Sequence, residues 1–477
     1  MFRKLLSHAA VYGLAAQVPR VAGILALPII TPYLSSLDYG VAGVITAYVV
    51  ALNTVHSLGL STVMVNSYAR NPKRYKWVWR QLHGFLSGWG VLYGFIIGAV
   101  LWWGMPVEAR ENRWELLALN VLPPVLFGVT EFQAMMLFQI SQRPLPVAVR
   151  SFVVGLITVG LNIYTIAYLK MGYMGWFYAN AAGTLVGFIL YGYPLYFREK
   201  MWPIFNFKWK RIRNSLHISL PVIPHHFSFF LLDTSDRLVL DILKVPVPRI
   251  GLYNIASSFG LYFMAASNAV VQAASPFYLQ FYSTSKENPQ AARQARSMTF
   301  LLQALFLAVT FVLCLWMKEL FILLIRNKEL QKAYPLAVIM LMGYNYRPMY
   351  LAVINLLSYH EKTRAFWKIS SVAGVGNVVL NIILVPFFGI EAAAVTTFLA
   401  LMYMGYSGYT LREYKEAADI NYYPWLWLLA TIAALIIVFA LANADQVYKV
   451  ILTVLLMIVG LYGGLVYKNR VNKIVEV

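Results

Sequence analysis

Cysteine and charge are both scarce in this chain of 477 residues. Its single cysteine, Cys314, lies in an apolar run, so an internal disulfide is excluded. Asp, Glu, Lys and Arg make up 12% of the residues, whereas a soluble domain has about 25%. With 60% hydrophobic residues, the chain could not cover itself with polar surface. These shortages exclude a soluble or disulfide-stapled protein and predict a protein that crosses a membrane many times.

Acidic residues are the scarcer charge type, 19 against 39 basic ones, and the net charge is +20. Such an excess can serve nucleic-acid binding, but in a membrane protein it normally reflects basic loops on the cytoplasmic side. The basic stretches 70–80 and 198–213 fall on the same side as both chain ends when predicted spans are counted. We therefore expect cytoplasmic N- and C-termini, contact of the basic loops with membrane lipids, and no nucleic-acid partner.

Motifs for metal binding and catalysis are also missing from the sequence. There is no Asp-x-Asp motif, and no loop is long enough to form a catalytic domain outside the membrane. A membrane glycosyltransferase or polymerase is therefore disfavoured. We expect that the protein is not an enzyme and has neither a cofactor nor a metal site.

Apolar stretches of about 20 residues predict an all-α polytopic membrane protein with about fourteen transmembrane helices. They lie near residues 9–34, 40–66, 82–104, 114–139, 146–169, 172–197, 216–241, 250–280, 296–316, 334–357, 367–387, 389–411, 422–442 and 447–468. The longest loop follows the sixth stretch. We predict an N-terminal six-helix lobe (1–200), a basic cytoplasmic linker (201–215), a C-terminal six-helix lobe (216–412) and two last helices with a tail (413–477). The first stretch is expected to be an uncleaved span.

A weak internal repeat supports the division into two lobes. The matching positions are Asn162 with Asn381, Gly172 with Gly389 and, more faintly, Asp38-Tyr-Gly40 with Arg249-Ile-Gly251. The offset corresponds to six spans, an even number, so both halves enter the membrane from the same side. Parallel repeats are related by an axis along the membrane normal, and the binding site lies between them. We expect a central cavity there.

Three segments carry a resemblance to a known family. They are Ala26–Ile45 (ALPIITPYLSSLDYGVAGVI), Ser219–Phe259 with its Asp-Arg and Gly-x-Tyr elements, and Leu380–Ala400 (LNIILVPFFGIEAAAVTTFLA). The chain resembles the Wzx-type polysaccharide flippases of the multidrug/oligosaccharidyl-lipid/polysaccharide (MOP) exporter superfamily. The resemblance implies two lobes that work by alternating access. It also implies movement of undecaprenyl-pyrophosphate-linked oligosaccharide repeat units from the inner to the outer leaflet of the bacterial inner membrane.

The resemblance leaves a second function open, because the same superfamily contains H⁺- or Na⁺-coupled multidrug exporters. For the flippase, the partners are the lipid-linked oligosaccharide and membrane lipids, and the product serves O-antigen, capsule or exopolysaccharide assembly. We expect a monomer that works beside the polysaccharide polymerase machinery.

Charged residues within the predicted spans are the candidates for function, since each costs about 2.5–3.5 kcal/mol in lipid and must face the interior. They are Arg20, Glu131, Asp233, Asp236, Arg237 and Arg347. Arg20 and Arg347 are expected to bind pyrophosphate, because a guanidinium stays charged and forms paired hydrogen bonds. The alternative is that they pair with Glu131 or Asp233.

Neighbours of these two arginines complete the predicted substrate site. Gln17 shares a helical face with Arg20. Tyr344 and Asn355 lie near the face of Arg347. Together the five residues form the expected pyrophosphate and sugar site.

The stretch 220–253 carries most of the remaining charges. On one ideal helix His226, Asp233 and Arg237 would share a face. Asp233, Glu131 and His226 are candidates for ion coupling, because a buried carboxylate can take up H⁺ or help to bind Na⁺. Packing is the alternative for His226. Asp236 and Arg237 are expected to form a structural ion pair that anchors neighbouring helices.

Overall fold

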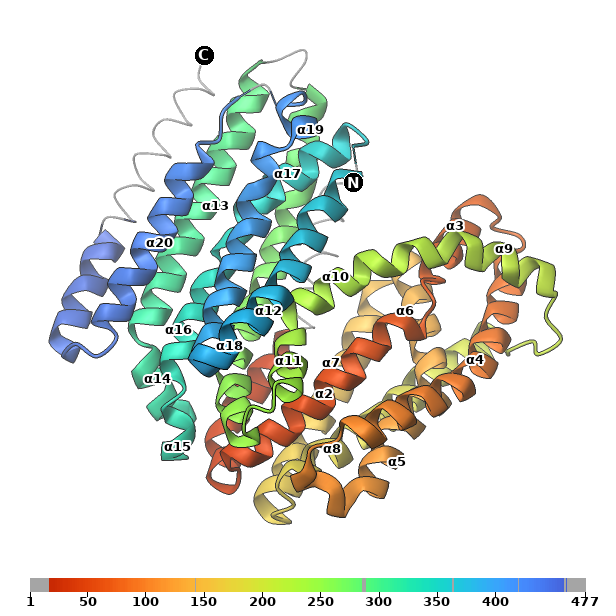
Figure 1. Ribbon diagram of the computed structural model, residues 1–477. Coiled ribbons are helices and arrows are strands. Elements are labelled where there is room, and N and C mark those ends of the chain that lie inside the picture. Colours follow the sequence, from red (N-terminus) through yellow and green to blue (C-terminus); the bar gives the residue numbers. More distant parts are fainter. Residues whose placement is uncertain are drawn as a thin grey trace.

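A computed structural model describes residues 17–141, 143–284, 289–362, 364–418, 420–458 and 460. Every regular element in these ranges is helical (Figure 1). Eight helical stretches of the described residues are long and apolar enough to cross a membrane, which confirms the all-α membrane fold. The predicted spans at 114–139 and 334–357 are helical throughout, with a π-helical segment at Pro124–Gly128 in the first and a 3₁₀ segment at Tyr344–Tyr346 in the second.

The N-terminal lobe consists of helices that pack mainly on one another. After a helical stretch at 17–30 they are η1 (Thr31–Tyr33), α2 (Ser36–His56), α3 (Ser61–Arg70), α4 (Tyr75–Gly104), η2 (Val107–Asn112), α5 (Arg113–Pro123), η3 (Pro124–Gly128), α6 (Val129–Ile140), α7 (Pro144–Ile163), η4 (Tyr164–Tyr168), α8 (Tyr173–Tyr193) and η5 (Pro194–Arg198).

The C-terminal lobe contains two very long helices, α12 and α18. Its elements are α12 (Val247–Thr284), α13 (Pro289–Leu315), α14 (Met317–Leu324), α15 (Lys328–Gln331), α16 (Tyr334–Gly343), η7 (Tyr344–Tyr346), α17 (Arg347–Tyr359), α18 (Arg364–Tyr406), η8 (Ser407–Thr410), α19 (Arg412–Lys415) and α20 (Pro424–Leu441). A helix over 446–458 follows.

Four short helices connect the lobes: α9 (Trp209–Ser219), η6 (Leu220–Val222), α10 (Ile223–Asp233) and α11 (Ser235–Ile242). Helix α9 contacts α3, whereas α10 packs on α18 and α2. The predicted linker 201–215 therefore ends in a helix from Trp209 onward. The prediction of one continuous span at 216–241 was wrong, because Thr234 has φ −137° and interrupts the helix. His226 and Asp233 consequently share no continuous helical face with Arg237.

The two lobes are in contact at one end and diverge toward the other (Figure 1). The start of α2 and helix α11 lie where the lobes meet. Helices α3 and α9 of one lobe and α19 of the other lie at the diverging end. That end also carries the loop 71–74. This loop belongs to the basic stretch 70–80, which the sequence predicts to lie on the cytoplasmic side.

The contact between the lobes depends on a glycine-mediated crossing of α2 and α12. A Cβ atom on Gly40 would lie 2.1 Å from the carbonyl oxygen of Val247, and one on Gly251 would lie 1.8 Å from that of Ser36. Gly40 and Gly251 are 211 positions apart, and so are Ser36 and Val247. The contact is thus reciprocal, as an axis relating two parallel repeats requires. Only glycine lets the two backbones approach this closely.

A second pair of glycines repeats between the lobes. Gly172 has φ 54° and ψ −137°, and Gly389 has φ 65° and ψ −146°. Glycine adopts this backbone conformation at little cost. Gly172 precedes α8, and Gly389 separates the two halves of α18, so the predicted spans 367–387 and 389–411 meet at this turn. The equivalence supports the internal repeat.

Substituting Gly251 by Ala should weaken the crossing, because overpacking costs about 1–3 kcal/mol and such a cost shifts a two-state equilibrium about 5- to 150-fold. A cysteine at Thr46, in a Cys314→Ala background, should then react faster with a membrane-impermeant thiol reagent added outside cells. Gly376→Ala is the control, since a Cβ on Gly376 has no neighbour within 4 Å. Equal rates in both variants would contradict a closed crossing.

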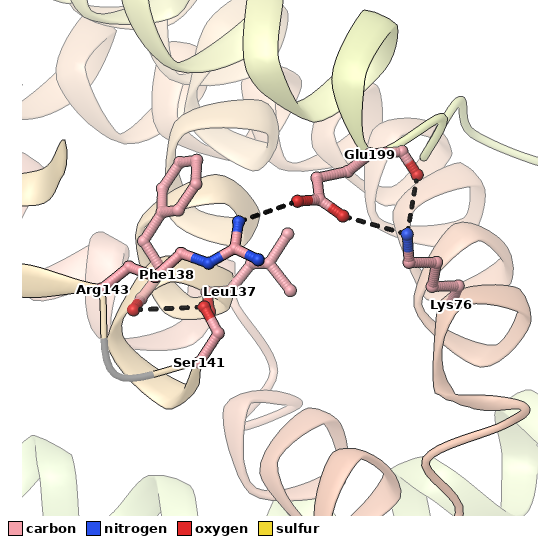
Figure 2. A network of polar contacts seen from close by, with 6 residues as sticks. All are labelled: Lys76, Leu137, Phe138, Ser141, Arg143 and Glu199. Atoms are coloured by element: carbon pink, nitrogen blue, oxygen red, sulfur yellow. Dashed lines mark hydrogen bonds and ion pairs between the residues drawn. The ribbon is translucent and has the colours of Figure 1, made fainter.

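An ionic network holds three helix ends of the N-terminal lobe together (Figure 2). Glu199, which follows η5, accepts from Lys76 Nζ at 2.9 Å and from Arg143 Nη1 at 3.1 Å. Lys76 lies in the first turn of α4 and Arg143 precedes α7. Burial raises the pKa of Glu199, but the hydrogen bonds and charges of Lys76 and Arg143 outweigh burial and lower that pKa below its ordinary value.

Glu199→Gln should destabilise the protein at neutral pH by about 1 kcal/mol, a typical value for partly exposed ion pairs. A lowered folded-state pKa gives stability that is present above the ordinary pKa and lost as the pH falls through the folded-state value. The difference from wild type should therefore close in acid. Thermal unfolding at pH 7 and below pH 4 tests this, with Glu108→Gln on the exposed part of η2 as the control. A difference that persists in acid would contradict it.

Candidate functional site

A central cavity of about 400 Å³ lies between the lobes. Its lining comes from the stretch 17–30, α2, α7 and α8 on one side and from α10 to α12 on the other. Arg237 is the one charged residue among the lining residues, and most of its polar neighbours are neutral amides or hydroxyls. The interior location of the cavity agrees with the expectation from the repeat.

Arg237 is held against α12 and makes no ion pair with Asp236. Its Nε donates to Asn254 Oδ1 at 2.9 Å, its Nη1 to the Asp233 carbonyl oxygen at 3.1 Å, and its Nη2 to Ser257 Oγ. No carboxylate of the described residues lies within 4.0 Å of it. The predicted ion pair was wrong, because successive residues of a helix point in different directions.

Asp236 instead anchors helices through hydrogen bonds to neutral groups. Its Oδ1 accepts from Asn377 Nδ2 at 2.7 Å and from Asn381 Nδ2 at 2.8 Å. Its Oδ2 contacts the hydroxyls of Tyr253 and Thr397. The side chain is 2% exposed. Asp236 therefore ties α11 to α12 and α18.

Asp236→Asn should destabilise the protein by about 2 kcal/mol, because the charged acceptor of four buried contacts becomes neutral and one of its two oxygens is replaced by an NH₂ donor. Thermal unfolding in detergent measures this. Asp445→Asn, at an exposed position, is the matched control. A stability equal to that of the control would show that the hydrogen bonds to Asp236 do not stabilise the fold.

The structure brings Arg347 and Gln17 to the same segment of α12. Arg347 Nη1 lies 3.0 Å from the Met264 carbonyl oxygen, 2.6 Å from Ser267 Oγ and 2.7 Å from Asn268 Oδ1. Gln17 Nε2 donates to the Ala265 carbonyl oxygen at 3.0 Å. The two predicted residues therefore approach neighbouring carbonyl groups, although they are 330 positions apart in the sequence.

Arg20 is exposed, and its Nη1 lies 3.5 Å from Gln17 Oε1. It stands three and seven positions before Gly23 and Leu27, which line the central cavity, and so shares their helical face. This places Arg20 beyond the cavity toward the diverging end of the lobes. Arg347 contacts residues 264–268 of α12, which follow Tyr262, the last α12 residue that lines the cavity. Neither arginine lies within 4.0 Å of a carboxylate among the described residues.

The other two predicted substrate residues are placed differently. Tyr344 is buried and packs against α12, where a Cβ on Gly260 would lie 2.8 Å from its ring. It is thus close to the segment that binds Arg347. Asn355 donates to the Leu351 carbonyl oxygen of its own helix at 2.8 Å and is 8% exposed. No contact links Asn355 to Arg347 among the described residues.

The three predicted coupling residues do not form one group. Asp233 ends α10, is half-buried and lies within electrostatic range of Arg347, although beyond ion-pair distance. Glu131 lies in the other lobe, on α6, where its carboxylate would be 3.2 Å from a Cβ on Gly187 of α8. The side chain of His226 lies outside the described part of the structure.

Neutral polar residues of the cavities were missed by the sequence analysis. Asn254 accepts a hydrogen bond from Arg237, and Ser267 and Asn268 contact Arg347. Asn180 and Thr46 line the central cavity and are exposed. The sequence-based prediction rests on charged residues within spans, and these amides and hydroxyls carry no charge. Polar residues that recur on one face of an apolar helix, such as Thr46 and Asn53 seven positions apart, were the available signal.

The described residues thus form a helical membrane protein of two lobes, with an interior cavity that contains the buried Arg237. Residues 5–281 match the family model described as polysaccharide biosynthesis protein. Because the match covers more than half of the chain, the chain belongs to this family. The polysaccharide family expected from the resemblance is thereby shown.

Solved structures with the same fold include a flippase and drug transporters. The lipid II flippase MurJ in an inward closed conformation is 12% identical, with a TM-score of 0.61 over 92% of this chain and 99% of that one. An inward-facing multidrug resistance MATE family transporter of the MOP superfamily is 14% identical, with a TM-score of 0.55 over 89% and 96%. A MATE structure in complex with MaL6 is 13% identical, with a TM-score of 0.55 over 90% and 96%. No curated protein sequence matches the chain.

Proposed function

We propose that this protein is a flippase that moves undecaprenyl-pyrophosphate-linked oligosaccharide repeat units across the bacterial inner membrane for surface polysaccharide assembly. One observation carries the proposal. The charged groups in and beside the central cavity that lack an ion-pair partner among the described residues are mainly basic: three arginines, Arg20, Arg237 and Arg347, against one carboxylate, Asp233. Such a site favours an anionic headgroup.

Arg20 and Arg347 are suited to hold the pyrophosphate as it enters from the diverging end of the lobes. A guanidinium has five N–H donors, so Arg347 keeps donors for a ligand while its Nη1 contacts α12. Gln17 and Tyr344 stand beside them. The diverging end faces the cytoplasm in this proposal, with both termini on that side, and the α2–α12 crossing closes the opposite side. The protein acts as a monomer beside the polymerase machinery.

Ion coupling through Asp233 or Glu131, with H⁺ or Na⁺, would drive the cycle. Each carboxylate is half-buried and accepts no side-chain hydrogen bond from another described residue. Asp233 is the better placed, because it lies within electrostatic range of Arg347. Protonation of Asp233 would change the field at the arginine that we expect to hold the cargo. His226 stays a candidate from the sequence.

A cation-coupled exporter of amphipathic drugs is the second candidate, and its support is the likeness of the fold to MATE transporters. An exporter of cationic drugs needs an acidic cavity to attract its cargo. The lining of the central cavity contains Arg237 and no carboxylate. Drug efflux by purified protein in vesicles would favour this candidate over the flippase.

Arg20→Ala and Arg347→Ala should each lower export of the repeat unit by roughly 10- to 100-fold, because a charge-assisted hydrogen bond contributes about 1.5–3 kcal/mol. The Lys variants should fall between, since lysine keeps the charge and loses the paired geometry. Surface polysaccharide and the leaflet position of the lipid-linked unit are measured in a deletion strain that carries each variant. Arg110→Ala, outside the central cavity, is the control.

Two outcomes would contradict the proposal. Normal surface polysaccharide in the deletion strain, with no second flippase present, would exclude the function. Normal export by both alanine variants at normal protein levels would leave the function standing and exclude the two arginines as its headgroup site.

A further inference from the structure

A second cavity, of about 390 Å³, lies inside the N-terminal lobe, and we call it the N-lobe pocket. Its size falls within the range of about 300–1,000 Å³ that is usual for ligand sites. Six polar residues from α2, α5 and α8 line it: Thr46, Asn53, His56, Asn120, Asn180 and Thr184. None of its described lining residues is Asp, Glu, Lys or Arg.

The N-lobe pocket divides the apolar core of its lobe into two clusters. One cluster contains Ile45, Leu116 and Phe177, and the other contains Leu58, Val129 and Tyr191. On α2, on the α5–α6 segment and on α8, the pocket residues fall between the members of the two clusters. The buried apolar residues of the C-terminal lobe form one large cluster instead. The described core of the N-terminal lobe is thus divided where the pocket lies, whereas that of the C-terminal lobe is one cluster.

The polar groups of the pocket are not used up by the fold. The Asn180 amide and the Thr46 hydroxyl make no hydrogen bond to another described residue. Asn120 donates to its own helix through Nδ2, which leaves its Oδ1 without a described partner. His56 Nε2 is buried and has no hydrogen-bond partner among the described residues. An unpaired buried polar atom is costly, and the side chains of Thr46 and Asn180 are exposed, so this set of polar groups can bind a polar ligand.

The N-lobe pocket adjoins the central cavity. Thr46, Phe177 and Asn180 line both. Thr46 and Asn180 are exposed, although both lie deep within apolar helices. A ligand held by Arg20 and Arg347 beside the central cavity could therefore extend into the pocket.

We propose that the N-lobe pocket binds the uncharged sugar residues of the cargo, while the arginines hold its pyrophosphate. This inference rests on the proposed flippase function. Sugar hydroxyls donate and accept hydrogen bonds, as do amide and hydroxyl side chains, and Phe177 adds an apolar wall for a ring face. The described lining of the pocket contains no Lys or Arg, so it lacks the charge-assisted hydrogen bonds that favour a phosphate over a neutral sugar. Headgroup and sugars are thus bound by different chemistry in adjoining spaces.

Two cysteine reporters in a Cys314→Ala background test the two spaces separately. Ala181→Cys lines the N-lobe pocket, and Gly23→Cys lines the central cavity near Arg20, where a Cβ has no neighbour within 4 Å. The rate of modification by a water-soluble thiol reagent is measured in purified full-length protein. The probes are inorganic pyrophosphate and the lipid-free oligosaccharide that mild acid releases from the lipid-linked pool of the native cells.

We expect the oligosaccharide to slow modification of Ala181→Cys about fivefold or more and pyrophosphate to leave it unchanged. Adding Asn180→Ala should raise the oligosaccharide concentration needed by about tenfold, a typical loss for one good hydrogen bond. Asn66→Ala is the matched control, because Asn66 is exposed on α3 and lines neither cavity.

The outcomes separate this inference from the proposed function. Protection of Gly23→Cys by pyrophosphate, without protection of Ala181→Cys by oligosaccharide, overturns the sugar pocket and leaves the headgroup site intact. Protection of Ala181→Cys by pyrophosphate alone makes the pocket an anion site and also overturns the inference. Protection by oligosaccharide that Asn180→Ala does not change removes Asn180 from the site and, with it, the pocket as assigned.

Discussion

The reciprocal contact of Gly40 with Val247 and of Gly251 with Ser36 sets the arrangement of the whole molecule. It joins backbone to backbone, so no side chain can adjust it, and any Cβ atom on either glycine would overlap a carbonyl oxygen. Because the contact is repeated about an axis between the lobes, each lobe presents the same element to the other. Everything beyond this crossing, including the central cavity and the diverging helices, follows from where the two helices meet.

Although the backbones of the two lobes are related, the interiors of the lobes differ. In the C-terminal lobe, Asn381 donates a hydrogen bond to Asp236 and accepts one from Thr396. The apolar core of this lobe is continuous. Its counterpart Asn162 lines the central cavity, and its Oδ1 is buried without a hydrogen-bond partner. Of the two equivalent amides, Asn381 thus stabilises the packing of its lobe, whereas Asn162 lines the central cavity. The two halves of the repeat therefore share a fold but use equivalent residues differently.

Much of the fold was predictable from the sequence because apolar run length and glycine-containing turns are local properties. The repeat pairs Gly172 with Gly389 correctly, and both have the same unusual backbone conformation. The site was only partly predictable. Arg347 and Gln17 meet at α12 through packing between distant helices, which no single-sequence pattern encodes. The Asp236–Arg237 ion pair, in contrast, could have been rejected beforehand, because adjacent helical residues do not face each other. The neutral amides were missed because charge alone was taken as the signal.

Helix α2 takes part in both the crossing and the cavities. Gly40 and Gly43 pack against α12, and Thr46 and Asn53 follow on the same helix. Six residues of α-helix span about 9 Å, and a helix is stiff over that length. The part of α2 that lines the cavities and the part that contacts α12 therefore belong to one stiff helix. In the proposed function, a ligand that moves Thr46 would also move Gly40, so ligand binding and closure of the lobes would be coupled through this helix.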